Sequence, residues 1–205
     1  MPRPGLQREQ VREFLARHGI ARLTELREVG VTSVTVSRME QDGELVRLSR
    51  GLYQMADAPL DANHSLAETA KRVPKGVICL TSALAFHQLT DQLPRRVWVA
   101  IGQKDWKPVV DRPLLRVVRF SDELLSDGVE SHSIEGVDVR IFGIPKTIAD
   151  CFRHRRTVGL PVAIEGLQEA LRQRKTTPSE IARSAALGGV STVVRPYLEA
   201  LTANG

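Results

Sequence analysis

The sequence predicts an α+β protein, with a small helical module and a hairpin at the N-terminus and a larger mixed domain behind them. Apolar residues at helical spacing, separated by glycines, occur within residues 1–55. Short apolar runs typical of strands lie between residues 77 and 142, and helical spacing returns from residue 145 onward. We therefore expect a helical module, then a small sheet, then a C-terminal helical layer.

The 205 residues are enough for two domains. The stretch ADAPLDAN, which ends at residue 63, is small, polar and interrupted by a proline, as linkers are. We expect an N-terminal domain over residues 1–57, a linker over residues 58–63 and a C-terminal domain over residues 64–205.

A short helix predicted over Ser33–Asp42 organises the N-terminal domain. Thr32 or Ser33 offers an oxygen that can cap its first turn. Gly43 can adopt the left-handed conformation that ends a helix. The sequence therefore predicts about three helical turns with a cap at each end.

One side of this helix is expected to be buried and the other exposed. Val36 and Met39 fall on the same side and form a narrow apolar stripe. On the other side, arginine and glutamine can bond to base edges in a major groove, serine can bond to bases or phosphates, and an exposed valine suits a thymine methyl group. We expect contacts with DNA from Thr32, Ser33, Val34, Ser37, Arg38 and Gln41.

The segments around this helix follow the order of a winged helix-turn-helix. A first helix ends at Gly19, and a second covers Leu23–Val29 before a glycine turn. Apolar residues over 45–48 and 52–55 flank the turn Ser49-Arg50-Gly51, which predicts a hairpin. We expect this hairpin to be the wing and to contact phosphates through Arg47 and Arg50.

Three small helices and a hairpin also occur in protein-binding modules, so that interpretation remains open. Charge does not decide between them, because residues 1–54 contain nine Lys or Arg and seven Asp or Glu, a net of +2. The whole chain has a net charge of +5, which favours an anionic partner. DNA binding would depend on where the arginines point.

The composition is that of an ordinary soluble protein, with 42% hydrophobic and 26% charged residues. The N-terminus lacks the apolar run of a secretion signal, and no stretch approaches the roughly 20 apolar residues that cross a bilayer. Cys79 and Cys151 lie in apolar runs, so buried free thiols are expected rather than a disulfide. We expect a cytoplasmic protein with no membrane contact.

The C-terminal domain is expected to combine a small sheet with helices. The predicted strands cover residues 77–80, 97–101, 114–120, 131–134 and 137–142. The predicted helices cover residues 64–73 and 83–89, begin at Pro145, continue around Leu160–Leu171, start again at Thr177 and finish around Val194–Leu201. Thr81 or Ser82 is the expected cap of the second of these helices, and Pro196 fits only the first turn of the last one.

A basic patch is expected near two helix ends of this domain. Residues 145–175 contain seven Lys or Arg and three Asp or Glu, a net of +4. Such a patch can bind nucleic acid or a protein partner, but clustered charge at helix ends is more often capping and solubility. The residues concerned are Arg153, Arg155, Arg156, Arg172, Arg174 and Lys175.

The sequence offers little support for catalysis. Asp91 and Asp105, with a nearby lysine, come nearest to a magnesium-dependent nuclease site, but they lie in expected loops and the pattern occurs by chance in most chains. His87 and Cys79 are too few ligands for zinc, and Asp150 is explained by pairing with a neighbouring arginine. We predict no enzyme activity, no catalytic residue, no cofactor and no metal site.

The chain resembles the AbiEi antitoxins of type IV toxin-antitoxin systems over nearly its whole length. The resemblance rests on Arg50-Gly51-Leu52-Tyr53 at the end of the hairpin, on Val77–Leu84 with His87 and Leu89-Thr90 after it, on Pro145–Phe152, and on the helix around Glu165. The family's frequent arginine before the Thr-Ile-Ala-Asp element is replaced by Lys146.

The resemblance implies a bacterial autorepressor whose N-terminal domain binds inverted repeats in its own promoter. It also implies that the C-terminal domain counters a nucleotidyltransferase-type toxin, with which it need not form a stable complex. One helix-turn-helix contacts little DNA, so two copies of the protein are expected on the operator, and they can bind there as a dimer. The alternative is a winged-helix regulator with a ligand- or protein-sensing C-terminal domain and no toxin partner.

Overall fold

A computed structural model describes residues 4–203 of the chain. The chain divides into two compact units. Unit 1 comprises the residues up to Pro74 together with His132–Val139, and unit 2 comprises Lys75–Ser131 together with the residues from Arg140 onward. The functional boundary predicted at residues 58–63 stays a prediction.

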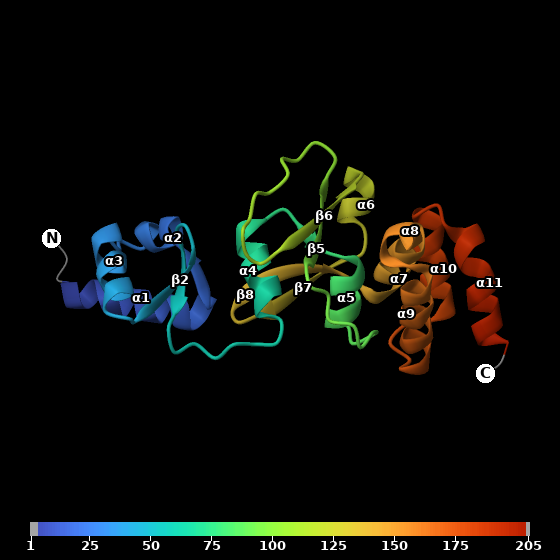
Figure 1. Ribbon diagram of the computed structural model, residues 1–205, viewed down its shortest axis with the longest axis horizontal. Coiled ribbons are helices and arrows are strands. Elements are labelled where there is room, and N and C mark those ends of the chain that lie inside the picture. The colour runs from blue at the N-terminus through green and yellow to red at the C-terminus, as the bar shows by residue number, and fades with distance from the viewer. Residues whose placement is uncertain (1–3, 204–205) are drawn as a thin grey trace. The chain divides into compact units, whose positions relative to one another are not determined.

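Unit 1 contains a helical module and a three-stranded antiparallel sheet (Figure 1). Its elements are α1 (Pro4–His18), β1 (Ile20–Arg22), α2 (Leu23–Glu28), α3 (Ser33–Gln41), β2 (Leu45–Ser49), β3 (Leu52–Met55) and α4 (His64–Arg72). The strand order is β1-β3-β2, with Ala21 of β1 opposite Tyr53 of β3. The predicted helices and hairpin are confirmed, and β1 is an addition to them.

The apolar residues that predict the helices of unit 1 form one core. Val11 and Leu15 of α1, Leu26 of α2 and Met39 of α3 are buried in a single cluster with Tyr53 of β3. Fully burying a large apolar side chain stabilises a fold by about 1.5–3 kcal/mol. Because these side chains come from α1, α2, α3 and β3, their burial fixes α3 against α1 and the sheet.

A tight turn in unit 1 is formed by two residues with positive φ. Glu135 and Gly136 have φ values of 51° and 73°, the pattern of a type I′ hairpin turn. The Glu135 carboxylate accepts a hydrogen bond from the backbone N–H of Asp61 at 2.6 Å and lies 2.8 Å from His64 Nδ1. Glu135 therefore anchors the start of α4.

The larger sheet has five strands in the order β6-β5-β4-β8-β7. β4 (Val77–Ile78) is antiparallel to β5 (Val97–Gly102) and parallel to β8 (Val137–Phe142). β6 (Leu115–Phe120) is parallel to β5 and forms one edge, and β7 (Val129–Ile134) forms the other. Every residue of β5 is buried, so this strand is covered on both faces.

The helices of unit 2 are α5 (Leu80–Phe86), α6 (Asp122–Ser126), α7 (Ile144–Arg153), α8 (Arg155–Val158), α9 (Leu160–Arg172), α10 (Pro178–Leu187) and α11 (Ser191–Thr202). The last five gather in the expected C-terminal helical layer (Figure 1). Leu84, Ile148, Phe152 and Leu167 are fully buried in its core. Within residues 4–203, no helix combines the length and the apolarity needed to cross a bilayer.

Several local details differ from the predictions. α5 begins at Leu80 with Cys79 as its N-cap, so neither Thr81 nor Ser82 caps it. Ser82 Oγ instead accepts a hydrogen bond from the backbone N–H of Trp98 at 3.0 Å. Pro196 lies inside α11, beyond its first turn. The short helices α6 and α8 have too few residues to produce a clear helical period.

Candidate nucleic-acid interface

α3 is capped at its start and ended by a glycine, as the sequence predicts. Thr32 Oγ1 accepts a hydrogen bond from the backbone N–H of Thr35 at 3.3 Å. The helix ends at Gln41, and Gly43 follows with a φ of 75°. A threonine N-cap typically contributes about 1 kcal/mol to stability, so the start of α3 is well defined.

The two sides of α3 differ in the predicted way. Val36 and Met39 are buried, together with Thr35. The expected contact residues on the helix and its cap are all exposed: Thr32, Ser33, Val34, Ser37, Arg38 and Gln41. The open side of α3 therefore offers a guanidinium group, an amide, hydroxyls and one branched apolar side chain.

Gln7 connects α1 to the turn that precedes α3. Its side chain is almost fully buried, with 4% exposed. Gln7 Oε1 accepts hydrogen bonds from the hydroxyls of Thr32 and Thr35, and Gln7 Nε2 donates to the carbonyl of Gly30 at 3.4 Å. Gln7 is absent from the residues predicted from the sequence. Its position four residues before Val11, on the buried side of α1, was the available signal.

The β2–β3 hairpin holds the other two expected contact residues. Arg47 on β2 and Arg50 in the turn are both exposed. Gly51 has a φ of 72° in this turn, and the pairing register shifts between Arg47 and Ser49. Arg47 Nε donates to the carbonyl of Ser49 at 3.2 Å, which holds the side chain along the strand.

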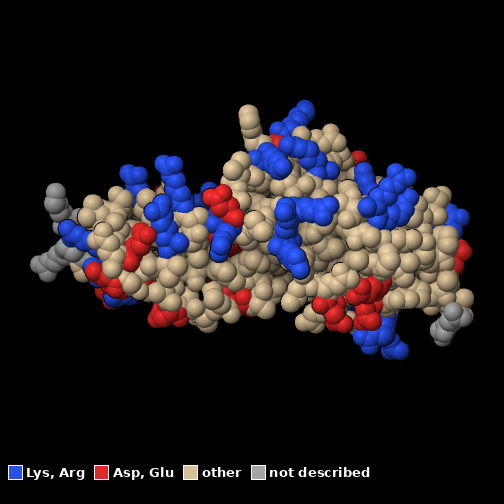
Figure 2. All heavy atoms as spheres, in the orientation of Figure 1, with Lys and Arg blue, Asp and Glu red and all other residues tan. Residues whose placement is uncertain are grey.

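Ion pairs neutralise arginines of α1 but not Arg38 of α3 or Arg50 in the β2–β3 turn. Arg8 and Arg12 both pair with Glu44, the second at 2.6 Å. Among residues 4–203, neither Arg38 nor Arg50 has a carboxylate within ion-pair distance. Figure 2 shows Lys and Arg side chains along the upper edge of unit 1 and Asp and Glu side chains along its lower edge.

The predicted basic patch of unit 2 lies at two helix ends. Arg153 Nη1 donates to the carbonyl of Gly188 at 3.4 Å, and Arg155 Nη1 donates to a carbonyl at the end of α7 at 3.0 Å. Arg156 and Arg174 are exposed, and neither has a hydrogen-bonding side-chain partner within the described residues. Part of this patch therefore caps helices.

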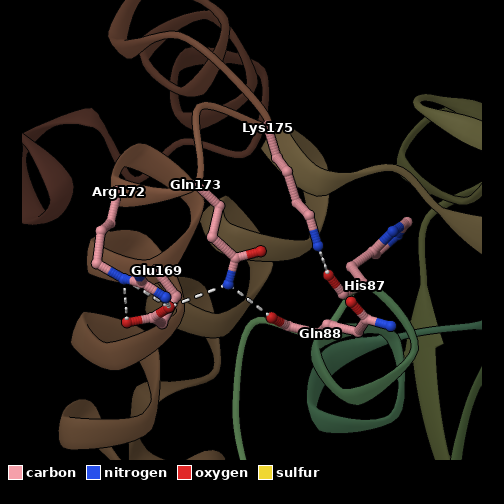
Figure 3. A network of polar contacts seen from close by, with 6 residues as sticks. All are labelled: His87, Gln88, Glu169, Arg172, Gln173 and Lys175. Atoms are coloured by element: carbon pink, nitrogen blue, oxygen red, sulfur yellow. Dashed lines mark hydrogen bonds and ion pairs between the residues drawn. The ribbon is translucent and has the colours of Figure 1, made fainter.

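The end of α9 is tied to the loop after α5 (Figure 3). Arg172 makes a bidentate ion pair with Glu169, whose pKa this hydrogen bonding lowers to about 2. Gln173 Nε2 bridges Glu169 and the carbonyl of Gln88. Lys175 Nζ donates to the carbonyl of the preceding residue in that loop, His87, at 2.6 Å.

A buried ion pair lies on α7, between residues four apart in the chain. Lys146 Nζ donates to Asp150 Oδ1 at 2.9 Å, and these side chains are 3% and 0% exposed. Burial raises the pKa of Asp150, and the positive charge of Lys146 opposes this. Lys146 Nζ also lies over the ring of Phe142, 4.9 Å from its centroid. The partner of Asp150 is thus Lys146 and not a neighbouring arginine, so that prediction is wrong.

Two of the residues considered for catalysis, Asp105 and His87, make contacts within the fold. Asp105 Oδ2 accepts a hydrogen bond from the backbone N–H of Gly102 at 2.9 Å, which closes the turn after β5. His87 Nε2 lies 2.8 Å from a carbonyl at the end of β8. Cys79 and Cys151 are buried free thiols, as predicted, and burial raises the pKa of each. Within residues 4–203, no three His, Cys, Asp or Glu side chains are placed to hold a metal ion.

Comparison with known families supports the identity of the N-terminal segment. Residues 9–56 match a family model described as a transcriptional regulator, AbiEi antitoxin. This segment includes α2, α3 and the β2–β3 hairpin, and with them all eight expected DNA-contact residues. The match confirms the resemblance to AbiEi antitoxins over residues 9–56, and the resemblance of the later segments stays a prediction.

Comparison with solved structures supports the fold. The chain is similar to the crystal structure of the RV2827C protein from Mycobacterium tuberculosis, with a TM-score of 0.58 and 14% sequence identity. The similarity covers 94% of this chain and 80% of that one, so it includes both the helical module and the larger domain. No curated protein matches the chain.

Proposed function

Because residues 9–56 match transcriptional regulators of the AbiEi antitoxin family, we propose that the protein is a DNA-binding autorepressor and the antitoxin of a type IV toxin-antitoxin system. The N-terminal domain binds inverted repeats in its own promoter. The C-terminal domain counters a nucleotidyltransferase-type toxin. The supporting observation is the exposed polar side of α3, which lies inside the matched segment.

α3 is the proposed recognition helix. Arg38 and Gln41 are exposed, and their side chains have the donor and acceptor groups that match guanine and adenine edges in a major groove. Ser33 and Ser37 can bond to phosphates or bases, and Val34 can contact a thymine methyl group. Since Arg38 makes no ion pair among residues 4–203, binding to DNA breaks no existing interaction of its guanidinium group.

The β2–β3 hairpin is the proposed wing. Arg50 is exposed in the turn and Arg47 is exposed on β2, where both can reach phosphates beside the groove. Contacts to phosphates carry no base information but fix the orientation of the protein on the duplex. Thr32, at the N-cap of α3, is a further phosphate contact in this proposal, in which its hydroxyl exchanges the hydrogen bond to Gln7 for one to a phosphate oxygen.

A second copy of the protein is expected on the operator. One recognition helix contacts only a few base pairs, so an inverted repeat requires two copies for high affinity. Pairing of the copies can come from protein dimerisation or from bending of the DNA between the half-sites.

The cytoplasm is the expected compartment for a regulator of this kind.

An electrophoretic mobility shift with the DNA upstream of the protein's own gene tests the DNA-binding part. We expect a saturable shift that competitor DNA of scrambled sequence does not remove. A triple variant, Ser37→Ala with Arg38→Ala and Gln41→Ala, should abolish this preference. Equal binding of the upstream and scrambled DNA by the unmodified protein would contradict the proposal.

Co-expression tests the antitoxin part. If a nucleotidyltransferase gene lies directly downstream, its product should inhibit growth, and this protein should restore it. The triple variant of α3 should still restore growth when expressed from an unrelated promoter, because the proposed antitoxin activity belongs to the C-terminal domain. Failure of the unmodified protein to restore growth would favour the alternative, a regulator with a sensing domain and no toxin.

A further inference from the structure

A second basic surface lies in unit 2, at the β6 edge of the five-stranded sheet. Residues 91–119 contain seven Lys or Arg (95, 96, 104, 107, 112, 116 and 119) and three Asp or Glu (91, 105 and 111), a net of +4. A cavity of about 290 Å³ opens on this surface. Its lining includes Thr81, Gln92, Arg95, Arg96, Trp98 and Arg116, and no carboxylate side chain among the described residues lines it.

The strand register places an arginine over an aromatic ring beside this cavity. Trp98 of β5 lies directly opposite Arg116 of β6 in the parallel pairing. The Arg116 guanidinium carbon is 4.2 Å from the centroid of the Trp98 ring, which is within cation–π distance. Trp98 is 6% exposed and Arg116 is exposed, so the ring supports one face of the guanidinium group and leaves the other open.

Arg95 and Arg96 add two more positive charges at the cavity. Both are exposed and precede β5 directly in the chain. None of Arg95, Arg96 and Arg116 has a carboxylate partner among residues 4–203. Three guanidinium groups without a carboxylate partner around one cavity favour the binding of an anion. The oxygens of a phosphate match the planar donor geometry of these groups.

A buried hydroxyl at the same cavity lacks a partner. Thr81 Oγ1 is buried and makes no hydrogen bond within the described part of the chain. It is not used as the cap of α5, whose N-cap residue is Cys79. Buried polar groups are nearly always satisfied, so this hydroxyl, which has almost no accessible surface, can bond to a ligand only after a neighbouring side chain moves.

We propose that this cavity binds a nucleoside phosphate, either a free nucleotide or the 5′-phosphorylated end of an RNA. Arg95 and Arg96 bind the phosphate oxygens, and the open face of the Arg116 guanidinium group stacks on the base. The cavity volume lies at the lower end of the range for small-molecule sites, which suits a ligand with one base.

Calorimetric titration of the full-length protein distinguishes the two sources of the phosphate. The probes are AMP, GMP, CMP and UMP, the corresponding 5′-phosphorylated tetraribonucleotides, and adenosine as the control without phosphate. Saturable binding of at least one phosphorylated probe, with no binding of adenosine, is the expected result. Tighter binding of the tetraribonucleotide than of its mononucleotide assigns the site to RNA, and equal binding assigns it to free nucleotides. Absence of binding by every phosphorylated probe would overturn the proposal.

Substitutions locate the binding event. Arg116→Ala should weaken binding about tenfold or more, and so should the double variant Arg95→Ala with Arg96→Ala, which leaves the Trp98 pair intact. Arg195→Ala, an exposed arginine on α11, should bind as the unmodified protein does. In a Trp106→Phe background, Trp98 is the sole tryptophan, and its fluorescence should change on binding. An equal loss in Arg195→Ala and Arg116→Ala would show non-specific charge attraction and would refute the site.

This inference does not depend on the proposed DNA-binding function. All residues of the cavity belong to unit 2, whereas the recognition helix and wing belong to unit 1. Arg116→Ala should therefore retain the shift of upstream DNA, and the triple variant of α3 should retain nucleotide binding. Each proposal can fail while the other holds.

Discussion

Gln7 Oε1 accepts a hydrogen bond from the hydroxyl of Thr35, a residue 28 positions away on α3. The same oxygen accepts from the Thr32 hydroxyl at 3.0 Å, so one buried amide joins α1 to the cap and the first turn of α3. The apolar contacts of α3 set its distance from α1. The hydrogen bonds of this amide also restrict the orientation of α3 relative to α1, because a hydrogen bond weakens steeply as its angle changes.

Replacing this amide should destabilise the fold. Gln7→Ala removes the acceptor for two hydroxyls and leaves a gap in a position that is 4% exposed. We expect a loss of about 1–3 kcal/mol in the free energy of unfolding, measured by urea denaturation. Gln168→Ala, the same substitution at an exposed position of α9, should change it by less than about 0.5 kcal/mol. Equal effects of the two substitutions would argue against a structural role for Gln7.

Alanine substitutions at two glycines should distinguish the cost of a left-handed backbone from the cost of a steric clash. Gly43 and Gly19 both have positive φ, 75° and 59°. A Cβ at Gly43 has no atom within 4 Å, so Gly43→Ala should cost about 1–2 kcal/mol for the left-handed conformation alone. A Cβ at Gly19 would lie 1.7 Å from the carbonyl oxygen of Glu135, so Gly19→Ala should cost clearly more in urea unfolding. A cost for Gly19→Ala no larger than for Gly43→Ala would contradict this close approach.

Local signals explain which parts of the fold the sequence predicts. α3 is recognisable because its cap, apolar stripe and terminal glycine all lie within Thr32–Gly43. The β2–β3 hairpin is recognisable because only Arg50 and Gly51 separate its two strands. β1 contains only three residues and pairs with β3, so that Ile20 lies opposite Gln54, and nothing near β1 in the sequence indicates that partner. The start of α5 is predicted wrongly for a similar reason. Ser82, one of the two expected caps, instead accepts a hydrogen bond from the backbone N–H of Trp98, which is 16 residues away.

The candidate sites, too, are predictable from the sequence only where the signal is local in the chain. Exposure of Arg38, Gln41 and Arg50 follows from helical and hairpin geometry, and the structure agrees. The bonds of Gln7 cross more than twenty residues of sequence, so spacing along α1 suggests only that its side chain faces inward. The cavity beside Trp98 depends on the register between two parallel strands, which composition and periodicity do not determine.

The buried ion pair on α7 should behave as a unit. Lys146→Met leaves the Asp150 carboxylate buried and unpaired, and Asp150→Leu does the same to the lysine. We expect each single substitution to lower the free energy of unfolding by about 3–5 kcal/mol, and the double variant to recover most of that loss. Urea denaturation of the four proteins gives the coupling energy directly. Additive losses in the double variant would show that the two side chains do not depend on each other.

The capping box of α10 predicts a pH dependence. Glu180 Oε2 accepts hydrogen bonds from the backbone N–H of Thr177 at 2.8 Å and from its hydroxyl at 2.9 Å. The backbone hydrogen bond is the main cause of a Glu180 pKa below its ordinary value of 4.5. A carboxylate whose pKa is lowered in the folded state stabilises the fold above its unfolded pKa, and this stabilisation is lost as the pH falls through the folded value.

Glu180→Gln tests this dependence, because glutamine keeps an acceptor oxygen but does not titrate. The unmodified protein should be more stable than the variant at neutral pH, and the difference should stay constant down to about pH 5. Below pH 4.5 it should shrink as Glu180 becomes protonated. Urea unfolding at a series of pH values measures the difference. A gap that is the same at pH 7 and at strongly acidic pH would rule out a lowered pKa at Glu180.

Two arginines of the proposed DNA interface should respond differently to substitution. Arg38→Ala should reduce discrimination at one base pair of the operator by about 1–3 kcal/mol, because an arginine on the recognition helix bonds to a base edge. Arg50→Ala should weaken binding to all sequences alike and reduce the slope of log K against log salt by about one, because a wing arginine contacts phosphate. Competition binding with single-base operator variants, at several salt concentrations, measures both effects. Arg195→Ala on α11 serves as the charge-matched control and should change neither. If Arg38→Ala and Arg50→Ala weakened all sequences equally, Arg38 would be a phosphate contact and α3 would not recognise bases through it.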